Sequence, residues 1–216
     1  AHVNVRQGIK MSNGSWLFPV YWQEVEERWD WAQIPTDNTI HMHWPSRCGV
    51  MISLDGGGTF QPAGRLCAPY PLMENACVEA EPGHIIMLMR AQGCEWLYRS
   101  DSYDYGLTWS QARPSDIPSA CSKLALLKHG DHIMLVHNAR GDAGGDGFSQ
   151  RQNLSLWVSD DGLRSFDKRV PLAREGVVMF YPHAFVDEGR GSVYIACENA
   201  RQSYCLRIPF AQLWDE

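Results

Sequence analysis

One eight-residue pattern, Ser-x-Asp-x-Gly-x-Thr followed by an aromatic residue, constrains the fold of this chain more than any other feature. It occurs at Ser53–Phe60 and at Ser102–Trp109, and a variant with its glycine one place earlier occurs at Ser159–Phe166. The three copies start 49 and 57 positions apart. Each copy follows a short β-rich run, and two further apolar runs divided by a turn precede it. A repeat of this size with four short strands per unit predicts an all-β fold, namely a β-propeller.

The octet itself has the chemistry of a hairpin turn. Its Ser and Asp side chains can accept hydrogen bonds from nearby backbone N–H groups. Its glycine supplies a positive φ, and its aromatic ring packs beneath the turn. The stretch from Met73 to Trp109 shows a whole unit, with strands expected at 76–80, 84–89 and 94–100 ahead of the second octet.

Four such units account for the chain as one partial propeller domain. We expect blades at about 1–62, 63–113, 114–173 and 174–216, with long loops at 23–47 and 139–150. The last unit has strand patterns near 183–187, 192–197 and 204–208 but no octet. Four units are one or two short of a closed ring of this type, so the chain is expected to be a piece of a larger, six-bladed propeller.

Composition excludes several function classes. The formal net charge is -6 without a long run of either sign, which disfavours nucleic acid or an anionic membrane as the main partner. No stretch approaches the roughly 20 apolar residues of a membrane span. No charged segment followed by an apolar one marks a signal peptide, and the chain does not begin with Met, so both a secreted and a cytoplasmic location stay open.

Seven cysteines are scattered without a CxxC or HExxH pattern, so no metal site is expected. Cys197 and Cys205 could face each other across a hairpin, but free thiols are favoured. The Gly/Asp-rich segment 141–147 lacks the spacing of an EF-hand. We therefore expect neither a metal nor another cofactor.

The order of strands in an antiparallel blade sorts the polar residues. The start of strand one, the end of strand two and the start of strand three share one rim, whereas the octet turn lies on the opposite rim. The residues expected on the first rim are Tyr21, Glu74, Arg90, His137, Asn138, Arg151, Tyr181 and Glu198. Two arginines suit a carboxylate, because the guanidinium fork binds it bidentately. A glutamate beside a tyrosine can accept the phenolic proton.

Each of these residues also has a structural alternative. Glu74 and Arg90 could simply pair across a blade rim, Arg151 could be a solvated loop charge, and Tyr181 could pack on Pro182. His137 is expected to be a rim histidine with its hydrogen bonds satisfied. For Tyr21, ordinary packing between blades is as plausible as a binding role.

The octets, the blade spacing and the rim residues together resemble the sialidase (neuraminidase) superfamily with BNR/Asp-box repeats. In that family a segment of the type Asn-Glu-Cys-Gln-Val-Val-Glu-Leu, a turn glycine and an Asn-x-Arg ending precede an Asp box. Here Met73–Ala80, Gly83 and Leu88–Arg90 fall in step with it. The similarity runs over essentially the whole chain, although Met73 stands in place of asparagine and Pro182 in place of the usual serine.

The resemblance implies roles for individual residues. Tyr181 corresponds to the nucleophile and Glu74 to the glutamate that activates it. Arg90 and Arg151 correspond to two arginines of a triad that binds the substrate carboxylate, and Tyr21 matches a loop aromatic that helps line the sugar pocket. Asn138 and Glu198 are expected to contact the substrate from the same rim.

Two parts of the family's site have no counterpart here. The first arginine of the triad and the aspartic acid/base belong to blades N-terminal to those present. Asp30 and Asp37 lie in the long first loop, which is not the matching place. For the 216 residues by themselves, inactivity therefore stays open as an alternative to sialidase activity.

The leading hypothesis is an exo-glycosidase of sialidase type that hydrolyses terminal sialic acid, or a related acidic sugar, from glycoconjugates. It would be a retaining enzyme with a tyrosine nucleophile, an exception to the two-carboxylate scheme. One alternative is a lyase or hydrolase for uronate-containing polysaccharide with His and Tyr as acid and base. Another is a propeller that binds glycans without catalysis.

Overall fold

The computed structural model describes residues 2–23, 46–139 and 151–214, which form four antiparallel sheets in succession along the chain. The first sheet contains β1 (His2–Val5), β2 (Ile9–Lys10), β3 (Trp16–Gln23), β4 (Ser46–Ser53) and β5 (Gln61–Leu66). The second contains β6 (Leu72–Glu81), β7 (His84–Ala91), β8 (Trp96–Ser102) and β9 (Arg113–Pro118). The third contains β10 (Ala125–His129), β11 (His132–Asn138), β12 (Leu154–Ser159) and β13 (Lys168–Pro171). The fourth contains β14 (Phe180–Asp187), β15 (Ser192–Glu198) and β16 (Ser203–Pro209), with the 3-10 turns η4 (Glu188–Arg190) and η5 (Phe210–Gln212).

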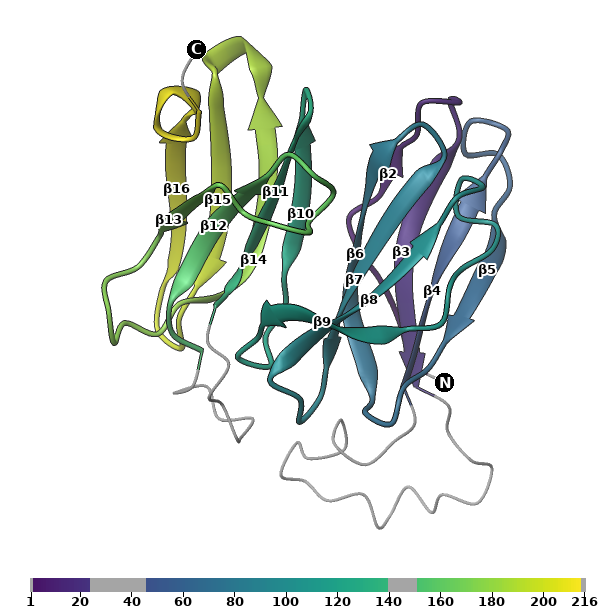
Figure 1. The fold of residues 1–216 in the computed structure, drawn as a ribbon, viewed down its shortest axis with the longest axis horizontal. Helices are drawn as coiled ribbons and strands as arrows, with labels where there is room; N and C mark the ends of the chain where they lie inside the picture. Colours follow the sequence, from purple (N-terminus) through teal and green to yellow (C-terminus); the bar gives the residue numbers. More distant parts are fainter. Residues whose placement is uncertain (1, 24–45, 140–150, 215–216) are drawn as a thin grey trace.

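The sheets are arranged as successive blades of a propeller. In each sheet the main path follows chain order from the first strand to the last. Neighbouring sheets meet through their early strands: β6 packs on β3 and β4, β10 packs on β6, and β14 packs on β10 and β11. Figure 1 shows the first two sheets on one side of the molecule and the last two on the other. The predicted all-β propeller with four blades is therefore confirmed.

The blades differ from the prediction in three details. The first strand of blade one, expected over 3–11, is broken into β1 and β2, and Gly8 lies in the break, where an added Cβ would be 2.5 Å from the Phe18 ring. The last blade has three strands among the described residues instead of four. The expected boundaries after residues 62 and 113 fall inside β5 and at the start of β9, so the first two sheets extend a few residues further.

Burial along the strands follows the position of each blade. In β7 every residue after His84 is buried, since its blade is covered on both faces by blades one and three. That strand accordingly reads as a continuous apolar run, Ile-Ile-Met-Leu-Met. In β16 exposed and partly buried residues alternate over most of the strand, as expected for a sheet with one covered face.

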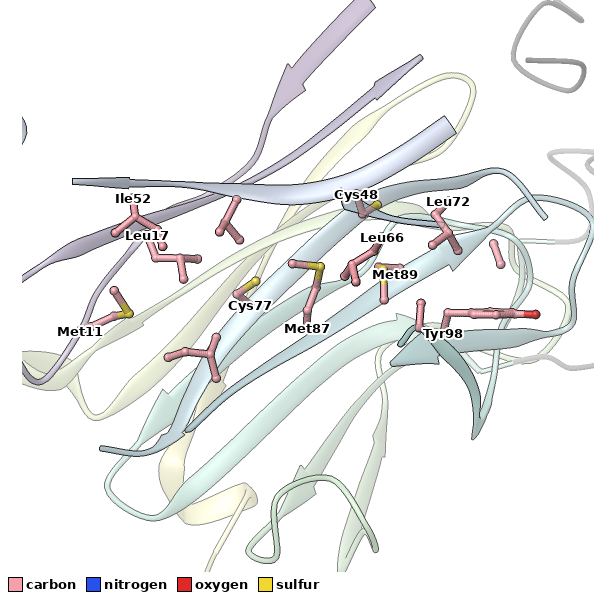
Figure 2. Close-up of a cluster of buried hydrophobic side chains, with 14 residues drawn as sticks. Met11, Leu17, Cys48, Ile52, Leu66, Leu72, Cys77, Met87, Met89 and Tyr98 are labelled. Carbon is pink, nitrogen blue, oxygen red and sulfur yellow. The ribbon is translucent and has the colours of Figure 1, made fainter. Parts of the chain in front are cut away.

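The hydrophobic core lies between the blades as three separate clusters. Figure 2 shows the cluster between blades one and two, where Leu17 and Ile52 from one sheet face Cys77 and Met87 from the other. Each fully buried side chain of this size contributes roughly 1.5–3 kcal/mol relative to an exposed one. The interblade surfaces thus stabilise the sheets, and they leave the rims for polar side chains.

The three octets form equivalent turns. In the second octet, Asp104 accepts hydrogen bonds from the Ser102 hydroxyl (2.7 Å), the Thr108 backbone N–H (2.8 Å) and the Thr108 hydroxyl (2.6 Å). The third octet repeats this set around Asp161. Two successive residues of each turn have positive φ: Gly56 and Gly57, Tyr105 and Gly106, and Gly162 and Leu163. The early glycine of the third copy therefore occupies the first of two left-handed positions instead of the second.

None of the seven cysteines forms a disulfide, and all seven lie in the described ranges. Register explains why Cys197 and Cys205 do not pair. Cys197 lies opposite Tyr204, and Cys205 lies opposite Ala196, so the two side chains point to opposite faces of the sheet. Cys197 is buried and Cys205 is exposed. None of the helices in the described ranges is long and apolar enough to cross a membrane.

Candidate functional site

Three successive blades place a polar side chain at the same rim position. Glu74 stands two residues before Ala76, which pairs with Leu88. Lys123 stands two residues before Ala125, which pairs with Val136, and Tyr181 stands two residues before His183, which pairs with Ala196. Register therefore makes Glu74, Lys123 and Tyr181 equivalent residues of blades two, three and four.

Two of these residues have an unusual backbone. Glu74 has φ 44° and Tyr181 has φ 57°, both in the left-handed region that non-glycine residues rarely occupy. Each lies at a register shift in its first strand, between Met73 and Ala76 and between Phe180 and His183. Such bulges change the direction of a side chain, which otherwise alternates between the two faces of the sheet along a strand. Residues with strained backbone of this kind cluster at functional sites.

Glu74 forms a buried ion pair with Arg90. Arg90 Nη1 donates to Glu74 Oε2 at 2.6 Å, and Arg90 Nη2 donates to Gln92 Oε1 at 2.6 Å. Arg90 is only 6% exposed. Burial acts to lower the pKa of Arg90, but the Glu74 carboxylate outweighs burial and the pKa is raised overall. The guanidinium is therefore a fixed, permanently charged group.

Arg151 lies against the aromatic residues at the start of β14. Its guanidinium carbon is 4.7 Å from the centroid of the Tyr181 ring and 5.3 Å from that of Phe180. Arg151 is buried, and its carbonyl oxygen accepts a hydrogen bond from the Met179 backbone N–H at 3.3 Å. The loop before β12 and the start of β14 are thus held together, so the cation is fixed beside the phenol ring.

A cleft of about 220 Å³ opens beside Tyr181 and is lined by Lys123, Tyr181, His183, Ala196, Cys197, Glu198 and Ser203. Lys123 is buried, and its Nζ lies 5.8 Å from the centroid of the Tyr181 ring. Burial and the positive charge of Arg6 lower the pKa of Lys123 to about 8, against the opposing effect of Glu74 and Glu198. The predicted site residue Glu198 therefore shares this cleft with Tyr181.

Tyr21 comes close to the same group from blade one. Its pKa is raised to about 12, chiefly by burial and then by the Glu74 carboxylate, while Arg6 and Arg90 act to lower it. Tyr181 also contributes to this shift. The Tyr21 phenol of blade one is therefore coupled electrostatically to Glu74, Arg90 and Tyr181.

Two predicted rim residues have structural surroundings instead. Asn138 is 1% exposed, and its side-chain amide donates to the carbonyl oxygens of Gln152 (3.0 Å) and Met179 (2.7 Å). It ties together the segments that carry Arg151 and Tyr181, which differs from the expected contact with substrate. His137 is buried with its ring edge-on to Trp157 at 4.6 Å, so it points into the blade and not to the rim.

Four further residues join the site without having been predicted: Arg6, Gln92, Cys121 and Lys123. Arg6 lies in the break between β1 and β2, and Gln92 and Cys121 surround the Arg90 guanidinium. The glycine at position 8, inside an expected strand, was a signal for that break. Lys123 could have been found by applying the rule for the start of strand one to the third blade.

Some expectations fall on residues outside the described ranges. The long loop over 24–45, with Asp30 and Asp37, and the Gly/Asp-rich segment 141–147 belong to this group. Within the described ranges, no group of three or more His, Cys, Asp or Glu side chains is arranged to hold a metal ion.

The arrangement combines three chemical capabilities. The guanidinium groups of Arg90 and Arg151 provide buried, oriented donors for an anion. Nε of Arg90 is buried and has no hydrogen-bond partner among the described residues. A phenol, a carboxylate and an ammonium, from Tyr181, Glu74 and Lys123, then supply a nucleophile and groups able to take or hold a proton.

Comparison with known proteins bears on the fold and the family. A family model described as the BNR repeat-like domain matches residues 2–195. No curated protein sequence matches the chain significantly. Among solved structures, the Hadza microbial sialidase Hz136 superimposes with a TM-score of 0.70 at 16% identity, over 95% of this chain and 37% of that one.

Two further sialidase structures are similar to the same extent. A mutant of the NanB sialidase from Streptococcus pneumoniae gives a TM-score of 0.69 at 15% identity, over 95% of this chain and 30% of that chain. The Trypanosoma rangeli sialidase bound to the inhibitor DANA gives 0.65 at 18% identity, over 97% and 33%. The chain thus spans about a third of the length of these structures, and at such identities the likeness concerns the fold.

Proposed function

Because the chain belongs to the BNR repeat-like domain family, we propose that its rim site is that of a sialidase-type exo-glycosidase acting on a terminal acidic sugar, sialic acid first. The observation that carries this proposal is that two side chains at equivalent rim positions, a carboxylate and a phenol, each contact a buried arginine. Glu74 is bonded to Arg90, and Tyr181 lies under Arg151, with both Glu74 and Tyr181 in the left-handed region at equivalent bulges. Strain at two aligned positions is hard to explain by packing alone.

In the proposed reaction, Arg90 and Arg151 bind the substrate carboxylate. Both are buried and held before substrate arrives, Arg90 by Glu74 and Gln92, so little side-chain entropy is lost on binding. The carboxylate is attached to the reacting carbon of the sugar. A neutral phenol approaches such a carbon without the repulsion that an Asp or Glu nucleophile would meet.

The phenol oxygen of Tyr181 forms the bond to the anomeric carbon while its proton passes to Glu74. The aglycone oxygen departs with the bonding electrons and takes a proton from a general acid or solvent. Water then hydrolyses the glycosyl–tyrosine bond, with retention of configuration. Lys123 and Arg151 lie beside the Tyr181 ring, and their positive charges favour the phenolate that develops.

The test is turnover of a fluorogenic sialoside by the wild-type protein and by Tyr181→Phe. We expect the substitution to lower kcat by at least about a hundredfold, since it removes only the nucleophilic oxygen. Tyr194→Phe is the matched control, because Tyr194 is in the same blade and stacks on Phe185, outside the cleft. Equal turnover by wild type and Tyr181→Phe, or no turnover by the wild type, would refute the proposed reaction.

One observation supports a second candidate. His183 lines the same cleft as Tyr181, and burial lowers its pKa, so the ring is a potential base at neutral pH. A lyase for uronate-containing polysaccharide could use these two side chains as base and acid. Its product has an unsaturated, ultraviolet-absorbing end, so an absorbance assay on polygalacturonate separates the two reactions. Glycan binding that survives Tyr181→Phe, without turnover of either substrate, would instead identify a non-catalytic lectin.

A further inference from the structure

A second, spacious groove lies away from the rim site, along the seam between blades two and three. It has a volume of about 780 Å³, within the range typical of ligand sites. Blade two contributes Trp96, Arg99 and residues 115–118 of β9, and blade three contributes Trp157, residues 163–166 and Arg169. None of the residues assigned above to the rim site lines it.

One arginine of the lining, Arg99, links the two walls of the groove. Arg99 donates from Nε and Nη2 to both carboxylate oxygens of Asp101, at 2.9 and 2.8 Å. Its Nη1 donates to the Gly162 carbonyl oxygen at 2.8 Å, across the seam from blade two to blade three. The charge of Arg99 is therefore neutralised, and its hydrogen bonds hold the walls at a set separation.

The walls carry exposed cations and aromatic rings. The Arg169 guanidinium lies 4.1 Å above the Trp157 ring, and Phe166 packs edge-on against that ring at 4.9 Å. On the opposite wall Trp96 is 37% exposed, an unusual degree for so large a ring. Arg164 and Arg169 are exposed and have no carboxylate partner among the described residues, while Asp116 is the single acidic residue of the lining.

We infer that this seam groove is a second carbohydrate-binding site, which takes a segment of a carboxylated polysaccharide. The lining carries positive charge, whereas the whole chain has a net charge of -6. An anion is therefore attracted to this groove although the protein as a whole repels it. Trp96 offers a ring face to the apolar face of a sugar, and Arg169 is already oriented by stacking on Trp157. Sugar rings are favoured over an acidic peptide because aromatic rings occur on both walls.

Affinity electrophoresis of the protein through gels containing polysialic acid, polygalacturonate or neutral dextran tests this inference. We expect the carboxylated polymers to retard the wild type and dextran to leave it unchanged. Trp96→Ala should weaken the interaction several-fold, and Arg164→Ala with Arg169→Ala about tenfold. Arg113→Ala is the matched control, because Arg113 is exposed on β9 but does not line the groove, and Tyr181→Phe should also leave retardation unchanged.

Three results would overturn the inference. Absence of retardation in both carboxylated gels would show that no such site exists. Loss of retardation in Arg90→Met, with no effect of the Trp96 and arginine substitutions, would assign binding to the rim site. Equal retardation by polyglutamate would show a general affinity for polyanions and not for sugars. Far-ultraviolet circular dichroism of each variant establishes that a lost interaction is not lost folding.

Discussion

The Arg151 guanidinium carbon lies 4.7 Å from the centroid of the Tyr181 ring, although the two residues belong to different blades. Two sets of hydrogen bonds hold these residues together. The Met179 backbone N–H donates to the Arg151 carbonyl oxygen, and the Asn138 amide donates to the carbonyl oxygens of Gln152 and Met179. Arg151 thus contacts the ring of the proposed nucleophile, and in the proposed reaction it would bind the substrate carboxylate beside that ring.

Replacing Arg151 by methionine should raise KM for an acidic substrate by about 10- to 100-fold, because a charge-assisted, bidentate contact is lost. Arg151→Lys should restore little of the affinity, since an ammonium lacks the planar fork. Arg174→Lys, an exposed substitution outside the cleft, should leave KM unchanged. Steady-state kinetics on a sialoside checks these values. A wild-type KM in Arg151→Lys would contradict the bidentate contact between Arg151 and the substrate carboxylate.

Glu74→Gln should affect both stability and activity. The substitution keeps the shape of the side chain but leaves Arg90, which is buried, without its anionic partner. We expect a loss of about 1–3 kcal/mol in the free energy of unfolding, since an unpaired buried charge is costly. Urea unfolding of the single variants and of Glu74→Gln with Arg90→Met measures the coupling. Strict additivity of the two single effects would show that the pair does not interact.

Lys123 should set the alkaline limit of activity. Its pKa of about 8 means that the ammonium beside Tyr181 loses its proton as the pH rises through 8. We expect kcat/KM of the wild type to fall above that pH and the fall to shift upward in Lys123→Arg, which keeps its charge. In Lys123→Met the rate should be lower and flat between about pH 7 and 9. An unchanged profile in both variants would exclude a role for this charge.

His137 should make the fold sensitive to mild acid. Burial lowers its pKa to about 3, from 6.5 in an unfolded chain. Between these values the unfolded state binds more protons than the folded state, so stability is full above about pH 6.5 and falls as the pH decreases toward 3. The loss between pH 7 and pH 4 is on the order of 3 kcal/mol.

The variant His137→Phe keeps a ring against Trp157 and removes the titration. Its free energy of unfolding should therefore change less between pH 7 and pH 4 than that of the wild type. The octet carboxylates titrate in a lower window, because their folded pKa values lie below 3.8, as for Asp55 at about 2. Parallel pH dependence of the two proteins above pH 4 would contradict the assignment to His137.

The fold was predictable because its signals are local. Each octet turn is closed by hydrogen bonds between residues at most four positions apart. Examples are the backbone N–H of Thr108 to the Asp104 carboxylate and that of Gly106 to the Ser102 hydroxyl, so the eight-residue motif alone identifies the turn. Strand order within an antiparallel blade then follows from connectivity. This is why the sequence alone predicts one rim for Glu74, Arg90, Arg151 and Tyr181.

The details of the site depend on contacts between residues far apart in the chain. The sequence by itself determined the propeller, the blade order and the rim on which the charged residues gather. Only the tertiary structure decided that Asn138 turns inward, that Lys123 and Arg6 join the site, and that Glu74 and Tyr181 adopt left-handed backbone at matching bulges. Packing between blades sets these features, and it unites side chains as distant as Asn138 and Met179 or Lys123 and Tyr181, which no local pattern encodes.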